Sequence, residues 1–443
     1  MKSLIKKLIP KSVLRVYHQT MAYAADFYYG HPSGQMIVIG VTGTKGKSST
    51  CFLIAKILEE AGYKVGLTST AMFKIGEREW LNPYKMTMLG RFGLQKFLRQ
   101  MVKAGCQYAI IETSSEGILQ SRHIGIDYDV AVFTNLAPEH IEAHGSFEKY
   151  REAKGELFKK IKNVECRMKN IDGKLISKVI IVNGDDDNAG YFLQFSADEK
   201  TTYGLENNTN KLQATSYKLQ EDGIDFEVGG IQFHTSLVGK FNLYNTLAAI
   251  TVAQSQGVDL ETCKRALEKV LTIPGRMEFI DEGQSFKVIV DYAHNSSSFE
   301  ALYEAIKQIS HNRVIHVFGG IGGGRDKGKR LEMGKIAAGY ADIVIVTTDD
   351  PYTEDPQEIS RQVISGIVDY ELRIKEGALF DIIDRKVAIQ KAIELAQPDD
   401  MILVTGKGCE QKMAIGGKMI PWDDREVVRE ILKKYSRNTV EIQ

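Results

Sequence analysis

The sequence predicts an α/β protein with two parallel sheets, each covered by helices on both faces. Short apolar runs of strand length alternate with stretches of helical period along most of the 443 residues, which is the pattern of βαβ units. A polar segment at 200–236 interrupts the alternation, which starts again after Gly275. We therefore expect an N-terminal extension over residues 1–35, a first α/β domain over 36–274 and a second over 275–443.

The strands of the first domain are expected where apolar runs end in polar or turn residues. Met36–Val41 is the first strand, and Ser48–Ala61 is a helix that ends at Gly62. The segment 200–236 carries short alternations typical of an antiparallel insertion or sheet edge. The remaining strands expected in this domain are Lys64–Thr68, Tyr108–Glu112, Val130–Asn135, Val179–Asn183, Ala214–Leu219, Ile224–Val228 and Ile231–His234.

The second domain repeats the alternation after a junction near Thr272–Arg276, and its pattern indicates a Rossmann-like α/β fold. The strands expected in it are Val288–Asp291, Val314–Gly319, Ile343–Thr348 and Met401–Thr405. Such sheets bind ligands at the carboxyl ends of their strands, so polar residues that follow these runs are candidate site residues.

Composition excludes several classes of protein. The chain has 57 Lys+Arg and 57 Asp+Glu, so it carries no electrostatic footprint for nucleic acid. Its apolar runs fall short of the roughly 18–20 residues that span a bilayer, so no stable membrane insertion is expected. The five cysteines lie far apart, which argues against a zinc ribbon or disulfide framework and favours a cytoplasmic location.

Residues 1–15 are basic and contain no acid. Leu4, Ile5, Leu8 and Ile9 alternate with the lysines there, so a membrane-surface helix is one interpretation. We favour a solvated helix that packs its apolar side on the body of the protein. No apolar core of a signal peptide or cleavage site follows.

A phosphate-binding loop is predicted between the first strand and the first helix, in the segment from Gly40 to Ser48. Glycines let backbone N–H groups surround phosphates at the N-terminus of a helix. Lys47 would reach the β- and γ-phosphates, and the Ser48 hydroxyl would bind Mg²⁺. The strict motif has glycine where this chain has Val41. The sequence thus predicts a P-loop-type ATPase domain that binds a nucleoside triphosphate.

Three further residues are candidates around this loop. Glu112 ends a predicted strand, so it is a candidate second Mg²⁺ ligand, although a carboxylate at a helix start is nearly as common there. His140 follows another strand, where a surface histidine is the conventional interpretation. Lys154 lies in a predicted helix, and its spacing gives it no special role.

Motifs along the chain resemble those of the Mur ligases, the ATP-dependent amide-forming enzymes of peptidoglycan precursor assembly. The resemblance is greatest to the subgroup that adds the third residue to UDP-N-acetylmuramoyl-dipeptide, the MurE type. It covers nearly everything from residue 36 to 430. The segments that carry it are Gly40–Thr50, Glu112–Ser115, Thr134–His140, Tyr150–Lys154, Gly239–Asn242 with Asn245, Pro274–Glu278, Asp291–His294, Gly322–Arg330, Asp349–Pro351, Gly406–Gly408 and Asp423–Glu426.

The resemblance implies roles for these residues. The ATP-binding positions are Gly43, Thr44, Lys45, Gly46, Lys47, Ser48, Ser49, Asn245, Arg276 and Asp291. The magnesium ligands are Ser48, Glu112, His140 and Lys154, with Lys154 carbamylated. The catalytic set is Lys47, His140, Lys154 and Arg276. The substrate positions are Thr87, Ser114, Gln120 and Arg122 for the acceptor, and Arg325, Asp349, Asp350, Gly406 and Glu410 for the amino acid.

The chain also departs from the family pattern. Only about 35 residues precede the first strand, so the usual uridine-binding domain is not expected, and the UDP part of the acceptor is open. Members that select meso-diaminopimelate carry Asp-Asn-Pro-Arg, where this chain has Tyr352 in place of the arginine. Tyr352 cannot form a bidentate ion pair with a carboxylate. The acids Asp349, Asp350 and Glu410 lead to the hypothesis that a basic amino acid such as lysine is used.

The expected function is therefore ATP-dependent joining of a muramoyl-peptide carboxylate and an amino acid through an acyl phosphate. The partners expected are these two substrates, and the protein is expected to be a monomer or weak oligomer. Two alternatives stay open. One is a folylpolyglutamate synthase-like ligase, to which Thr44–Cys51 and His294-Asn295 are somewhat similar. The other is a non-catalytic ATP-binding partner subunit.

Overall fold

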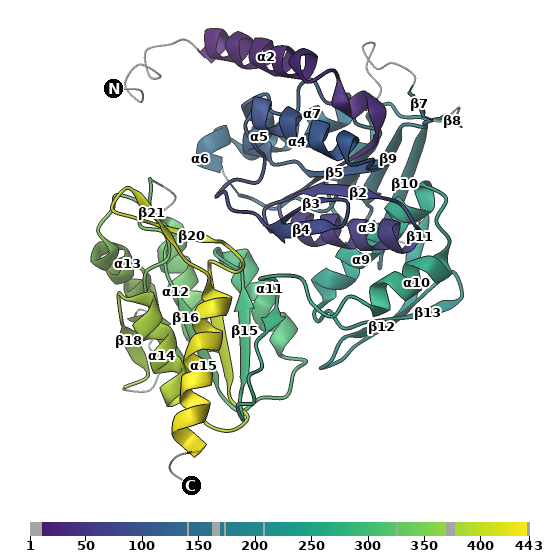
Figure 1. The fold of residues 1–443 in the computed structure, drawn as a ribbon. Coiled ribbons are helices and arrows are strands. Elements are labelled where there is room, and N and C mark those ends of the chain that lie inside the picture. The colour runs from purple at the N-terminus through teal and green to yellow at the C-terminus, as the bar shows by residue number, and fades with distance from the viewer. Residues whose placement is uncertain are drawn as a thin grey trace.

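A computed structural model describes residues 11–139, 141–161, 169–171, 174–206, 209–324, 327–368 and 377–440. It confirms the α/β class, with one large sheet in the first half of the chain and a smaller one in the second (Figure 1). His140 and Arg325 lie outside the described residues.

The first half forms an eleven-stranded sheet in the order β13-β12-β11-β10-β9-β6-β1-β5-β2-β3-β4. Strands from β11 to β2 pair in parallel, and an antiparallel hairpin closes each edge. Its strands are β1 (Ile37–Thr42), β2 (Val65–Thr68), β3 (Met72–Ile75), β4 (Arg78–Leu81), β5 (Tyr108–Glu112), β6 (Val130–Phe133), β9 (Val179–Asn183), β10 (Glu199–Gly204), β11 (Leu212–Leu219), β12 (Ile224–Val228) and β13 (Ile231–Thr235).

Helices cover both faces of this sheet because its parallel strands are apolar on both sides. One core layer joins the sheet to α3 (Lys47–Glu60), α9 (Lys240–Ser255) and α10 (Leu260–Glu268). The opposite layer contains α4, α5, α7 and α8. The bounds of the remaining elements of this half are α4 (Arg91–Lys103), α5 (Ser115–Leu119), α6 (Ile141–His144), α7 (Phe147–Lys159), α8 (Ala189–Leu193), η1 (Pro32–Gln35), β7 (Asn170–Ile171) and β8 (Lys174–Leu175).

The second half forms a six-stranded sheet in the order β14-β15-β19-β16-β17-β18, parallel except for β14. Helices α11, α12 and α13 pack on one face, and α14 and α15 on the other. The elements are β14 (Glu278–Phe279), β15 (Lys287–Asp291), α11 (Ser296–Ile306), β16 (Val314–Phe318), α12 (Gly328–Tyr340), β17 (Ile343–Val346), α13 (Pro356–Val368), β18 (Leu379–Asp381), α14 (Arg385–Leu395), β19 (Met401–Thr405), β20 (Lys412–Ile415), β21 (Lys418–Pro421) and α15 (Asp424–Val440).

The N-terminal helix α2 (Lys11–Tyr28) lies against α4 on the outside of the first half (Figure 1). Its buried contacts come from the small side chains Ala22 and Ala25, whereas Val16 is 63% and Phe27 is 77% exposed. In α2 the large apolar residues thus face outward, and the packing expected for the apolar side chains of residues 1–15 stays a prediction. Leu4, Ile5, Leu8 and Ile9 lie outside the described residues. Among the described residues, no helix has the length and apolar character needed to cross a bilayer.

Candidate active site

A cavity of about 710 Å³ lies where the carboxyl ends of strands from both sheets meet. Parallel strands present their following loops at this edge, which explains why residues far apart in the sequence gather there. Of the site residues expected from the sequence and described in the structure, all except Gly43 and Asp349 line the cavity. Those lining it are Thr44, Lys45, Gly46, Lys47, Ser48, Ser49, Thr87, Glu112, Ser114, Gln120, Arg122, Lys154, Asn245, Arg276, Asp291, Asp350, Gly406 and Glu410.

The phosphate loop joins β1 to α3 and requires two glycines. Gly46 has a φ of 80°, and a methyl group there would come within 2.2 Å of the Asn245 Oδ1 atom. A methyl group at Gly43 would come within 2.0 Å of the Thr134 Oγ1 atom. Val41, the departure from the strict motif, lies inside β1 and is fully buried. The loop begins after that residue, so a valine fits there.

Ser48 and Glu112 meet at the start of α3. The Ser48 hydroxyl donates to Glu112 Oε2 at 2.7 Å. The same carboxylate accepts from the backbone N–H of Thr70 at 2.7 Å and from its hydroxyl at 3.0 Å. The Lys47 ammonium donates to the Thr44 carbonyl at 2.8 Å, within the loop. A buried carboxylate thus lies beside the hydroxyl and the lysine of the phosphate loop.

Lys154 extends from α7 to the underside of the same loop. Its ammonium nitrogen donates to the Gly43 carbonyl at 2.6 Å and lies 4.4 Å from the centre of the Tyr150 ring. The side chain is buried, and this burial, together with the positive charge of Lys47, holds the pKa of Lys154 well below its ordinary value. Burial therefore favours the neutral amine of Lys154 over the ammonium, a property that its spacing along the chain did not indicate.

The other residues expected at the nucleotide come from three separate segments. Asn245, on α9, lies under Gly46. An Arg276 Nη atom lies 3.5 Å from the Ser48 Oγ atom, so a residue of the second half approaches the phosphate loop. Asp291 ends β15 and accepts the backbone N–H groups of Met277 and Ala293, each at 2.7 Å. The Asp291 carboxylate therefore also holds the junction between the halves in place.

Two loop residues that sequence reasoning missed also support the phosphate loop. Asn135 accepts the backbone N–H groups of Thr44, through its carbonyl at 2.8 Å, and of Lys45, through its side chain at 2.9 Å. The Thr134 hydroxyl donates to the Lys45 carbonyl at 2.7 Å. Both residues follow β6, which ends at Phe133 and not at Asn135 as expected, so placing the strand end two residues earlier would have identified them as loop residues.

The expected acceptor residues form one wall of the cavity. The Thr87 hydroxyl accepts from that of Thr70 at 2.9 Å, and thereby connects to Glu112. Ser114 caps α5 by accepting the N–H of Gly117 at 3.1 Å. Arg122 donates to the Gln120 side chain at 2.8 Å and to the Met88 carbonyl.

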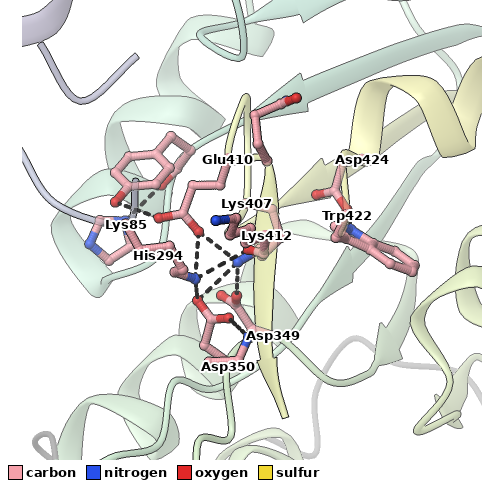
Figure 2. A network of polar contacts seen from close by, with 12 residues as sticks. Lys85, His294, Asp349, Asp350, Lys407, Glu410, Lys412, Trp422 and Asp424 are labelled. Carbon is pink, nitrogen blue, oxygen red and sulfur yellow. Dashed lines mark hydrogen bonds and ion pairs between the residues drawn. The ribbon is translucent and has the colours of Figure 1, made fainter. Parts of the chain in front are cut away.

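The expected amino-acid residues form a charged cluster at the opposite end, shown in Figure 2. Asp350 and Glu410 share the ammonium of Lys407, at 2.9 Å and 2.6 Å. Lys85, from the first half, contacts the same two carboxylates, with Glu410 at 2.9 Å. Asp349 lies behind them and is 1% exposed. Sequence reasoning identified the acids but missed both lysines, which balance two of the three negative charges.

Comparisons with known proteins find two matching families and several relatives. Residues 41–253 match the family described as Mur ligase middle domain, and residues 275–408 match the one described as Mur ligase, glutamate ligase domain. The chain is 38% identical over 434 residues to a UDP-N-acetylmuramyl-tripeptide synthetase of Roseiflexus sp. (strain RS-1), covering 96% of this chain and 84% of that relative. It is 38% identical over 430 residues to a UDP-N-acetylmuramoyl-L-alanyl-D-glutamate--2,6-diaminopimelate ligase of Geobacillus thermodenitrificans (strain NG80-2), covering 96% and 85%.

Solved structures show the same likeness. A structure of a UDP-N-acetylmuramoyl-L-alanyl-D-glutamate--2,6-diaminopimelate ligase superposes with a TM-score of 0.60 at 30% identity, covering 91% of this chain and 79% of the other. A folylpolyglutamate synthase of Mycobacterium tuberculosis superposes with a TM-score of 0.68 at 16% identity, covering 88% and 92%. The second likeness shows the fold alone, so it does not favour the folate alternative over a peptide ligase.

Proposed function

This chain belongs to the Mur ligase family, and on that basis we propose that it joins a muramoyl-peptide carboxylate to an amino acid with consumption of ATP. The observation that carries the proposal is that the phosphate loop, the acceptor wall and the charged cluster all line one cavity. A ligase needs its nucleotide, acid and amine within reach of one another, and no single half supplies all three sites.

The reaction proceeds in two balanced steps. An oxygen of the acceptor carboxylate attacks the γ-phosphorus of ATP, which gives an acyl phosphate and ADP. The amine of the amino acid then attacks the acyl carbon, loses a proton and displaces phosphate, which leaves an amide. The backbone N–H groups of the loop and the Lys47 ammonium would hold the phosphates in line for the first step. Arg276 would add a second cation from the other half.

The residues present fit magnesium. Ser48 and Glu112 offer hydroxyl and carboxylate oxygens at one point beside the loop, the ligand type that Mg²⁺ prefers. Among the described residues no group of three or more His, Cys, Asp or Glu forms a metal site by itself, so phosphate oxygens would complete the coordination. Bound there, Mg²⁺ would neutralise charge on the phosphates. His140, outside the described residues, remains a proposed ligand.

We propose that Lys154 is carbamylated and supplies a further carboxylate to this site. A neutral amine adds to CO₂ and releases one proton, and the burial of Lys154 favours the neutral form. The other assigned nucleotide positions, which are Gly43, Thr44, Lys45, Gly46, Ser49, Asn245 and Asp291, would hold ATP. Thr87, Ser114, Gln120 and Arg122 would hold the acceptor, and Arg325, Asp349, Asp350, Gly406 and Glu410 the amino acid.

This activity would serve peptidoglycan precursor synthesis in the cytoplasm, and through it cell shape and cell division. We propose the division into residues 1–35, 36–274 and 275–443, with the protein acting as a monomer or weak oligomer. The two sheets, which lie on either side of residue 275, support the second boundary.

An ADP-release screen tests the proposal. Purified protein, ATP and Mg²⁺ would be combined with UDP-linked or UDP-free muramoyl peptides, or a folate, and with each of the twenty amino acids or diaminopimelate. We expect ADP release only with a muramoyl peptide and a suitable amino acid, and a new amide by mass spectrometry. ADP release with folate and glutamate would favour the folate alternative. Nucleotide binding without ADP release in any combination would favour a non-catalytic partner subunit.

A further inference from the structure

The loop between β4 and α4, residues 82–90, connects the two ends of the cavity. Asn82 fixes its shape, because its side-chain amide donates to the carbonyls of Ser69 at 2.8 Å and Met86 at 3.1 Å. Thr87 in this loop contacts Thr70 on the acceptor wall. Two residues before Thr87, Lys85 extends to the second half of the chain and into the charged cluster.

The ammonium of Lys85 makes two hydrogen bonds and one further ion pair. It contacts Asp350 Oδ2, lies 2.9 Å from Glu410 Oε2 and lies 3.4 Å from the Lys412 carbonyl oxygen. We call these three acceptors the ammonium site. Lys85, whose side chain is 10% exposed, reaches it from the opposite half of the molecule (Figure 2). Lys407 also contacts two of the three oxygens, from its own half. The site is chemically complementary to any primary ammonium.

The charges around the ammonium site decide what else can enter it. Lys407 is fully buried and contacts the same two carboxylates, so with Lys85 in place two cations balance Asp350 and Glu410. A third cation would lie against these two ammonium groups, because Asp349, the remaining acid of the cluster, does not line the cavity. Replacing the Lys85 ammonium by another ammonium leaves the charge and the hydrogen bonds unchanged. An uncharged side chain cannot replace it, since both carboxylates would lose a partner.

We propose that Lys85 is a specificity-determining residue whose ammonium occupies the site of the side-chain ammonium of the incoming amino acid. A diamino acid enters by exchange with Lys85 and releases loop 82–90, whereas an amino acid with an uncharged side chain leaves Lys85 in place. This inference rests on the proposed function for the identity of the ligand as an amino-acid substrate. The exchange itself depends only on the contacts of Lys85.

Calorimetric titration of the full-length protein without nucleotide tests the exchange. L-Lysine is compared with L-norleucine, which has the same carbon chain but no side-chain amine. Lys85→Met removes the competing ammonium and keeps a side chain of similar length, so L-lysine should bind at least about tenfold more tightly. Norleucine binding should change little. Lys103→Met, at the exposed end of α4, is the matched control and should bind both like the wild type.

Hydrogen exchange provides the second measurement. L-Lysine should accelerate amide exchange in residues 82–90 of the wild type, norleucine should not, and Lys85→Met should exchange fast without ligand. Unchanged or weaker lysine binding by a folded Lys85→Met, verified by circular dichroism, overturns the inference, as does equal tightening for norleucine. If the ADP-release screen is negative while the exchange is observed, the proposed function fails and the ammonium site stands.

Discussion

Replacing Lys154 by methionine should change how the stability of the first half depends on pH. The folded chain holds Lys154 with a pKa well below 10.5, because the amine is buried and close to Lys47. The unfolded chain binds the proton at its ordinary pKa, so unfolding takes up a proton between these two pKa values. The free energy of unfolding therefore rises with pH in this window and levels off above 10.5.

The size of the pH effect follows from the uptake of one proton per molecule on unfolding. Each pH unit inside the window should raise the wild-type free energy of unfolding by about 1.4 kcal/mol relative to Lys154→Met. Lys154→Met should be the more stable protein at neutral pH, because methionine avoids placing an amine in an apolar position, and its advantage should shrink as the pH rises.

Urea unfolding in carbonate-free buffers between pH 7 and 9.5 measures this difference. Trp80 lies in the first half and Trp422 in the second, so a Trp422→Phe background makes the fluorescence report on the first half. Lys103→Met serves as the control lysine. Parallel pH dependences in Lys154→Met and the wild type would refute the reasoning. Adding bicarbonate should stabilise only the protein that retains Lys154, if the carbamate forms.

Three further substitutions test the site. Gly46→Ala places a methyl group 2.2 Å from Asn245 Oδ1, at a backbone φ of 80° that disfavours a side chain, so the affinity for a fluorescent ATP analogue should fall at least about tenfold. An unchanged affinity would contradict the geometry. Glu112→Gln removes the charge beside Ser48 and should lower ADP release at least about a hundredfold, with no loss expected if Glu112 only caps a helix. Burial raises the pKa of Asp349 to about 7, so the free energy of unfolding of the wild type should fall as the pH rises from 4 to 7. In Asp349→Asn this fall should be smaller, and an equal fall would argue against a buried carboxyl.

The sequence predicted the phosphate loop and its strands because their signals are local. The first strand was expected at Met36–Val41 and lies at Ile37–Thr42, and the following helix, expected at Ser48–Ala61, lies at Lys47–Glu60. Ser48, from the loop motif, and Glu112, from its place at a strand end, were each expected at a bound Mg²⁺, and the structure brings the two side chains into contact. The β3–β4 hairpin was missed, although Gly76-Glu77 between two short runs was a turn signal.

The charged cluster could not be predicted in the same way. Lys85 and Asp350 are 265 positions apart, and no local pattern distinguishes Lys85 from a surface lysine. Asp350 and Glu410 were therefore interpreted without Lys85, as a purely negative pocket. Lys407 is only three positions from Glu410, so this nearer partner could have been identified. The approach of Arg276 to Ser48, across 228 positions, likewise depends on how the two halves meet.

The two edges of the eleven-stranded sheet bear on how the chain behaves when it is concentrated or heated. Its most apolar strands, such as Val179–Asn183, lie in the interior, while one outermost strand carries Arg78 and Glu79 and the other carries Gln232 and His234. Edge strands with charged or polar side chains offer other molecules a poor template for pairing. Mild heating that detaches the β3–β4 hairpin would expose the edge of β2. Aggregation should therefore begin when that hairpin is lost, before the protein unfolds globally.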